Sequence, residues 1–247
     1  MSIWGKLIGG TAGFALGGPI GAIIGVMVAG AINKKSKDKS RFNFDQIKTD
    51  QKQQIFTLCF IILSAKLAKS DGIVTKDEIT AFKEKFKVPK SEINKVSKIF
   101  NEAKKDNYDY KQIANQVGQL FADNKILLEE LLNNLFFIAA SDGKISLSEV
   151  DLLRSISKCF NFSNNDFQRI FHLNLKYNDS DPYKILGINR KNSNIEIRKK
   201  WLKLNKEHHP DYLTAAGMPK EFIEQSNKEL AAINLAYDKI KKIRGIT

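Results

Sequence analysis

The stretch "DSDPYKILGINRKNSNIEIRKKWLKLNKEHHPDYL" (residues 179–213) decides the architecture of the carboxy-terminal part of the chain. It predicts a short helix that ends at Gly187, because glycine is the commonest residue just past a helix end. A basic helix then starts after Ser193 and continues through His208, since serine is a preferred N-cap residue. The apolar residues that recur at one-face spacing in this helix are Ile197, Trp201 and Leu204.

A further helix is predicted over "PKEFIEQSNKELAAINLAYDKIKKI" (residues 219–243), which packs back against the basic helix. The residues expected to make this contact are Phe222, Leu230, Ile233 and Tyr237. The two helices are then antiparallel and joined by an exposed tripeptide, His209-Pro210-Asp211. Pro210 holds His209 in extended geometry, because proline disfavours helical geometry in the residue before it. The opposite face of the basic helix carries Arg198, Lys199, Lys203 and Lys206.

These features together strongly resemble the J domain of DnaJ-type co-chaperones. The resemblance implies that His209, Pro210 and Asp211 trigger ATP hydrolysis by a DnaK-type heat-shock chaperone. It assigns chaperone docking to Arg198, Lys199 and Lys203. It assigns the core to Tyr183, Leu186, Leu204, Ile233 and Tyr237. The chain departs from the family pattern at three positions that bear on docking strength, Trp201, Leu202 and Tyr212.

The charge of the chain favours an acidic partner. Its 40 Lys and Arg residues stand against 27 Asp and Glu residues, a formal net charge of +13. Anionic lipid, an acidic protein surface and nucleic acid all fit this excess. Nucleic acid ranks last, because the chain shows no stacking platform or recognition motif beyond the charge itself.

No catalytic centre, cofactor or metal site is expected. A metal pair or general base formed by His208 and His209 is disfavoured, because no cysteine or third histidine lies nearby. The predicted activity is therefore regulatory and is exerted on the ATPase of a partner.

Residues 7–32 carry no charge, and a helix of that length spans about 39 Å, more than the roughly 30 Å hydrocarbon core of a bilayer. The sequence predicts a single transmembrane anchor within residues 1–33. A cleaved signal peptide fits less well, since its apolar region is shorter. A helical hairpin around "GGP" outside a membrane is a further alternative.

The flanks of this span predict its orientation. Lys6 stands alone before it, whereas a basic linker, residues 34–48, follows it. By the positive-inside rule, the amino terminus is periplasmic and the remaining chain is cytoplasmic.

Glycine recurs at every fourth position of the span. The positions are Gly9, Gly13, Gly17, Gly21 and Gly25. In lipid, such a ridge allows two helix backbones to approach closely. It predicts a homodimer formed through the membrane helix, with a Gly-rich span kinked at Pro19 as the alternative.

The middle of the chain contains a repeat, "SDGIVTKDEITAFKEKF" (residues 70–86) and "SDGKISLSEVDLLRSISKCF" (residues 141–160). Residues Asp71 and Glu78, like Asp142 and Glu149, match two positions of a calcium-binding loop, but the first and third ligand positions hold no oxygen ligands. The favoured reading has Gly72 and Gly143 as left-handed helix stops. Capping boxes over residues 75–78 and 146–149 then start the next helices.

The region resembles the TerB-like domain over residues 49–177. The resemblance implies a helical bundle whose acidic turns, Asp71, Glu78, Asp142 and Glu149, can bind a partner or weakly a metal. Further helices are predicted at about 91–104, 109–122 and 164–176. Cys59 and Cys159 are read as reduced, buried thiols, with a disulfide between them as the weaker alternative.

The predicted chain is all-α, with an anchor (1–33), a basic linker (34–48), a TerB-like domain (49–177) and a J domain (181–247). As a whole it resembles the membrane-anchored DnaJ-like co-chaperones of the bacterial inner membrane. Two functions remain, a regulatory co-chaperone and a membrane stress-response scaffold whose J domain is weak or vestigial. The intact tripeptide favours the first.

Overall fold

The computed structural model describes residues 3–6, 21, 48–69, 82–83, 86–105, 109–141, 143–175 and 180–245. Within these ranges the chain is helical and contains no strand, which confirms the predicted all-α class there. The helices are η1 (Ile3–Lys6), α2 (Thr49–Leu67), α4 (Ile93–Ala103), α5 (Tyr110–Leu120), α6 (Lys125–Ala139), α7 (Leu147–Cys159), α8 (Asn164–Asn174), α9 (Pro182–Leu186), α10 (Asn194–Glu207), α11 (Pro210–Ala216) and α12 (Lys220–Arg244).

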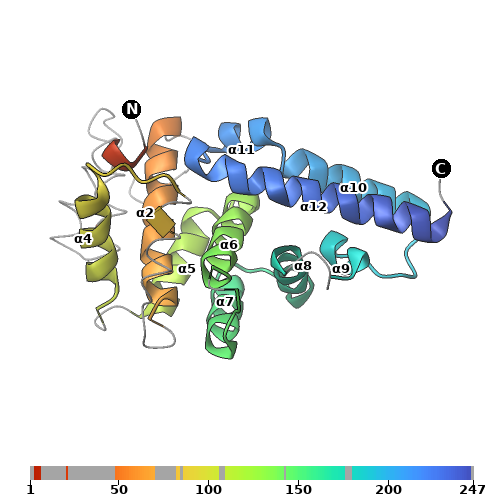
Figure 1. Cartoon of the computed structure of the whole chain (residues 1–247), viewed down its shortest axis with the longest axis horizontal. Helices are drawn as coiled ribbons and strands as arrows, with labels where there is room; N and C mark the ends of the chain where they lie inside the picture. The colour runs from red at the N-terminus through yellow and green to blue at the C-terminus, as the bar shows by residue number, and fades with distance from the viewer. Residues whose placement is uncertain are drawn as a thin grey trace, which may run out of the picture.

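Helices α2 to α8 form a bundle, which we call the middle bundle, around α2 and α6 (Figure 1). Every residue of α2 from Ile55 to Leu67 is buried, and α6 is buried almost all round. A helix that is apolar on all sides belongs in the interior, which explains why the amphipathic helices α4, α5 and α7 surround these two. The helices predicted near 91–104, 109–122 and 164–176 are confirmed as α4, α5 and α8. Cys59 and Cys159 are free thiols; Cys59 is buried as predicted, whereas Cys159 is only partly buried.

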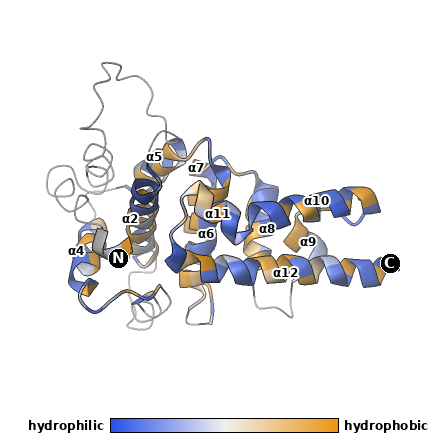
Figure 2. Ribbon diagram, turned by 90° about the horizontal axis from the view of Figure 1, so that it is seen from above, coloured by the Kyte–Doolittle hydropathy of each residue, from blue (hydrophilic) through white to orange (hydrophobic). Residues whose placement is uncertain are grey.

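Helices α9 to α12 form the carboxy-terminal domain, in which α10 and α12 lie side by side (Figures 1 and 2). The predicted core residues Tyr183, Leu186, Leu204 and Ile233 are buried there, together with Ile197 and Ile240. Trp201 and Tyr237 are partly buried at its edge and stack with ring centroids 4.3 Å apart. The antiparallel hairpin is therefore formed as predicted.

Phe222 was expected in this hairpin core, and that expectation is wrong. Its ring packs in the core of the middle bundle, 5.0 Å from the rings of both Phe56 and Phe60. The first turn of α12 extends past the end of α10, so only the rest of α12 faces α10, while the first turn meets α2. The two domains therefore share apolar core.

Residues 210–216, between the two predicted helices, form a further helix, α11. Pro210 occupies the first turn of α11, where a missing N–H costs nothing, and His209 is the N-cap. Gly217 ends the helix with φ 106°, a geometry that glycine adopts easily.

No helix among the described residues is long and apolar enough to cross a membrane. The predicted anchor lies almost wholly outside the described residues, as do Gly9, Gly13, Gly17 and Gly25. Gly21 is described, as a helical residue.

The amino-terminal turn η1 packs against the folded domains. The indole N–H of Trp4 donates to the carbonyl of Phe86 at 3.0 Å, and the ring lies 6.3 Å from that of Phe222. The backbone N–H of Ile3 donates to Glu221 at 3.1 Å. In a chain that crosses the membrane once with a periplasmic amino terminus, η1 would have to leave this site, because that crossing separates η1 from α2 and α12.

Candidate functional site

The predicted trigger tripeptide lies at the junction of α10 and α11. Helix α10 begins with a capping box, in which Ser193 and Glu196 exchange side-chain and backbone hydrogen bonds. It ends at His208, whose backbone N–H still bonds to the carbonyl of Leu204 at 2.9 Å. The tripeptide therefore follows directly from a well-formed helix end.

His209 adopts the extended geometry expected before proline, with φ −69° and ψ 134°. Its Nδ1 atom accepts a hydrogen bond from the backbone N–H of Asp211 at 3.2 Å. The His209 side chain is 54% exposed and that of Asp211 is 94% exposed. Both polar side chains of the tripeptide thus face solvent.

The predicted docking residues lie on the exposed side of α10. Arg198 and Lys199 are exposed, and the Lys203 side chain is 63% exposed. Lys203 forms an ion pair with the partly exposed Glu207 at 3.7 Å, and ion pairs at the surface constrain a side chain little. These three side chains, called here the basic face, are free to meet an acidic partner.

His208, the residue before the tripeptide, points the other way and is fully buried against the middle bundle. Its Nε2 atom lies 2.9 Å from a carboxylate oxygen of Glu129, and its Nδ1 atom lies 2.9 Å from one of Glu130. Both glutamates belong to α6. Glu229 of α12 lies 3.8 Å from Nδ1.

Further buried side chains complete this group. Arg169 of α8 forms an ion pair with Glu129. The hydroxyl of Ser226 donates to Glu130 at 2.7 Å, and the amide of Asn133 donates to Glu229 at 2.8 Å. We refer to the five ionisable residues, Glu129, Glu130, Arg169, His208 and Glu229, as the His208 cluster.

The charged groups of the His208 cluster shift one another's pKa values. Burial alone lowers the pKa of His208, but the carboxylates of Glu129 and Glu130 raise it to about 10. Burial disfavours ionised Glu129, but the charges of Arg169 and His208 hold its pKa below the usual range. Burial, and then the negative charge of Glu130, raises the pKa of Glu229 well above its usual value.

Glu130, His208 and Glu229 are the one group of histidine and acidic side chains in the described part of the chain whose ligand atoms converge closely enough to suggest a metal. A carboxylate lies beside each nitrogen of His208, an arrangement that favours a proton on each nitrogen. A doubly protonated imidazole has no lone pair to offer a cation. The arrangement therefore fits an ion-pair cluster better than a metal centre.

The second acidic turn, between α6 and α7, has the predicted capping structure. Gly143 has φ 92°, and Ser146 and Glu149 form the predicted capping box at the start of α7. Glu149 is 5% exposed, and its carboxylate accepts from the backbone N–H of Ser146 at 2.8 Å. Asp71, Glu78 and Asp142 lie outside the described residues.

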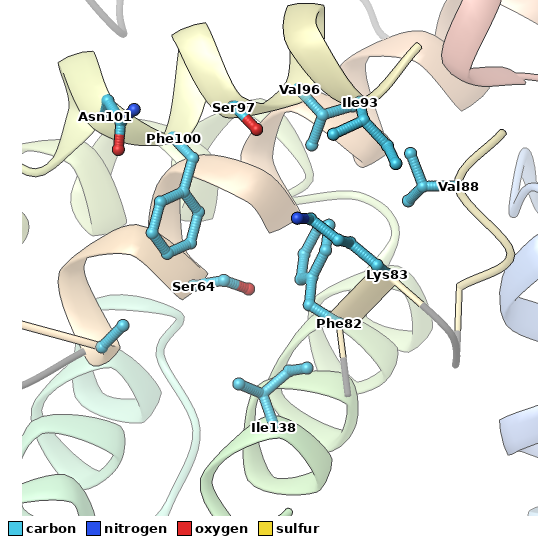
Figure 3. A pocket seen from close by; sticks show the side chains of 11 residues that line it. Ser64, Phe82, Lys83, Val88, Ile93, Val96, Ser97, Phe100, Asn101 and Ile138 are labelled. Atoms are coloured by element: carbon cyan, nitrogen blue, oxygen red, sulfur yellow. The ribbon is translucent and has the colours of Figure 1, made fainter. Parts of the chain in front are cut away.

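A cavity of about 170 Å³ lies beside α2 and α4 (Figure 3). Its lining is mostly apolar, with Ser64, Ser97 and Asn101 as neutral polar groups and Lys83 as the one charged side chain among the described residues. Among the described lining residues, no pair of titratable groups meets there.

Sequence reasoning treated His208 only as a possible partner of His209, and the structure points the two side chains in opposite directions. The signal it missed was Glu129-Glu130, two adjacent acids inside the mostly apolar run "KILLEELLNNLFFIA". Buried acids need partners, and the partner came from a different domain.

Three family models match the chain, in the order expected. They describe the co-chaperone DjlA transmembrane domain (residues 1–39), the tellurite resistance protein TerB (residues 57–172) and the DnaJ domain (residues 181–243). No solved structure matches.

Curated relatives match over nearly their full length. "Co-chaperone protein DjlA" of Coxiella burnetii is 27% identical over 98% of both chains. The protein of the same name from Photobacterium profundum is 26% identical over 98% of this chain and 99% of its own. That from Shewanella oneidensis is 24% identical over the whole of both chains.

Proposed function

We propose that this chain, which belongs to the DjlA-type co-chaperones, stimulates ATP hydrolysis by a DnaK-type heat-shock chaperone through His209, Pro210 and Asp211. The membership follows from the order of its three domain matches and from its full-length relatives. The J domain and the co-chaperone relatives assign it a regulatory role with a chaperone partner.

The observation that carries the proposal is the exposure of the tripeptide in a carboxy-terminal domain that is itself packed on the middle bundle. His209 and Asp211 face solvent although the neighbouring His208 is fully buried. Packing between the domains therefore leaves the trigger accessible to a partner.

The basic face supports the choice of partner. Residues 181–247 hold 14 Lys and Arg against 8 Asp and Glu, and Arg198, Lys199 and Lys203 are exposed next to the tripeptide. Complementary charge raises the rate of encounter with an acidic surface and fixes its orientation. We assign docking to these three residues and triggering to the tripeptide.

We further propose that residues 1–33 anchor the protein in the bacterial inner membrane, with residues 34–48 as a cytoplasmic linker. The match to a DjlA transmembrane domain and the one-sided basic flank support this. Both later domains, 49–177 and 181–247, then face the cytoplasm, where a DnaK-type chaperone is found. The glycine ridge pairs two copies of the anchor.

The test is single-turnover ATP hydrolysis by DnaK with the full chain reconstituted in phospholipid nanodiscs. Stimulation by the wild type that is lost in His209→Gln supports the proposal. Lys228→Gln is the control, because it removes an exposed charge of α12 away from the basic face. A folded wild-type chain that gives no stimulation contradicts the co-chaperone function and favours the scaffold.

A further inference from the structure

His208 joins the base of the tripeptide to a different domain. The glutamates that face its two ring nitrogens are consecutive residues of α6, both 2.9 Å away. A hydrogen bond between Nδ1 and Glu130 and a close ion pair between Nε2 and Glu129 contact opposite edges of the imidazole, and together they restrain the orientation of the ring as well as its distance. The end of α10 therefore has one position on α6.

We propose that His208 is a positioning residue that holds the end of α10 against α6, so that the middle bundle takes part in presenting the tripeptide to the chaperone. The effect that we expect on ATP hydrolysis rests on the proposed function. The effect that we expect on the mobility of α11 is independent of it.

A second set of contacts holds the chain on the other side of the tripeptide. Leu213 and Met218 are fully buried in the core shared with the middle bundle. The carbonyl of Met218 accepts from the side-chain amide of Gln53 in α2 at 3.4 Å, and that of Ala216 accepts from Asn124 at 3.5 Å. The chain is thus held both before and after residues 209–211.

His208 and the contacts that follow the tripeptide face the middle bundle, whereas the tripeptide itself faces away from it. His209 is 54% exposed and Asp211 is 94% exposed, although the residues on either side of them contact α6 and α2. An inhibitory contact would cover these side chains instead. The contact between the domains therefore presents the tripeptide.

Breaking the contact of His208 with α6 leaves buried charges without partners. Replacing His208 by glutamine removes the cation between Glu129 and Glu130, and an unpaired buried carboxylate is strongly unfavourable. The end of α10 is then expected to leave α6 for part of the time. A partner that binds only the positioned form sees a lower concentration of it, which raises the half-saturating concentration and leaves the maximal rate unchanged.

The experiment measures DnaK ATP turnover against the concentration of the full chain in nanodiscs. We expect His208→Gln and Glu130→Gln each to raise the half-saturating concentration roughly threefold or more while the maximal rate is retained. The double variant is expected to do no more than either single one, because both break the same contact. His209→Gln lowers the maximal rate instead, and Lys228→Gln matches the wild type.

Hydrogen exchange of the free chain tests the geometry without the chaperone. Amides of α11, such as that of Leu213, which donates to the carbonyl of His209 at 3.0 Å, should exchange faster in His208→Gln. If that variant does not fold, Ser226→Ala removes one bond to Glu130 and leaves every charge in place. Unchanged α11 exchange in a folded variant overturns the proposal. A wild type that fails to stimulate DnaK overturns the proposed function alone.

Discussion

The Nδ1 atom of His208 lies 2.9 Å from a carboxylate oxygen of Glu130, a residue 78 positions earlier in the chain. This contact shows that the middle bundle and the carboxy-terminal domain depend on each other. An acid in the middle of an almost wholly buried helix costs folding free energy unless a partner neutralises it. Here the partner comes from the domain that carries the tripeptide, so a residue of one domain neutralises a buried acid of the other.

Stability should therefore depend on pH through His208. The glutamates raise its pKa above the 6.5 of an ordinary histidine to about 10. A raised pKa gives stabilisation that is complete below about pH 6.5 and is lost as the pH rises through about 10. We expect His208→Gln to lower the free energy of unfolding by about 3 kcal/mol at pH 6 and by much less at pH 10. Urea unfolding of both chains, followed by circular dichroism, measures this, and a difference independent of pH would contradict it.

Gly187 should tolerate no side chain, for two reasons. It ends α9 with φ 66°, and a Cβ atom there would lie 2.7 Å from Cδ of Arg169. Gly187→Ala adds the strain of a left-handed residue, about 1–2 kcal/mol, and displaces Arg169 from Glu129. The expected result is a lower midpoint of thermal unfolding.

Gly245→Ala is the matched control for Gly187→Ala. Gly245 ends α12 with a similar φ of 63°, but nothing lies within 4 Å of a Cβ atom placed there. The difference between the two variants isolates the contact with Arg169. Equal losses of stability would show that the close approach between α8 and α9 contributes nothing.

The local features were readable from the sequence because each depends on neighbouring residues. The Ser193 cap, the Gly187 stop and the capping box of Ser146 all formed as predicted. The pattern of apolar residues likewise placed the α10–α12 hairpin. These signals act within a few residues, which is the range over which a single sequence is informative.

The contacts between domains were not readable in the same way. Phe222 fits the apolar pattern of α12 whether it faces α10 or α2, and the pattern alone does not decide between them. His208 has the same ambiguity beside His209. Pairing Glu130 with His208 needs a long-range contact that one sequence does not reveal.

Calcium should not stabilise the turn at residues 143–149. The carboxylate of Glu149 already accepts from the backbone N–H and the hydroxyl of Ser146, both at 2.8 Å. We expect no change in the thermal midpoint when calcium is added, whereas Ser146→Ala costs about 1 kcal/mol through the lost cap. A calcium-dependent rise that disappears in Glu149→Gln would restore the metal reading.

The position of the amino terminus can be tested with a cysteine at residue 2. The flanking charges predict that Ser2→Cys reacts with a membrane-impermeant maleimide in intact spheroplasts. The packing of Trp4 against Phe222 makes the opposite prediction. Protection of the cysteine, together with a lower thermal midpoint in Trp4→Ala, would contradict the periplasmic amino terminus. Labelling would instead require Trp4 to leave this site in the membrane-inserted chain.

The glycine ridge should be needed for pairing but not for insertion. In a water-exposed helix each glycine costs roughly 1 kcal/mol relative to alanine, whereas in lipid a line of small residues allows close helix packing. We expect leucine at positions 13, 17 and 21 to preserve membrane insertion and to reduce dimers captured by an amine-reactive cross-linker. Leucine at Thr11 and Ala15 is the control, because in the predicted helix these residues would lie about 200° around the axis from the ridge. Equal cross-linking in both variants would show that the ridge does not pair the anchors, and any joint action of two J domains would then need another contact.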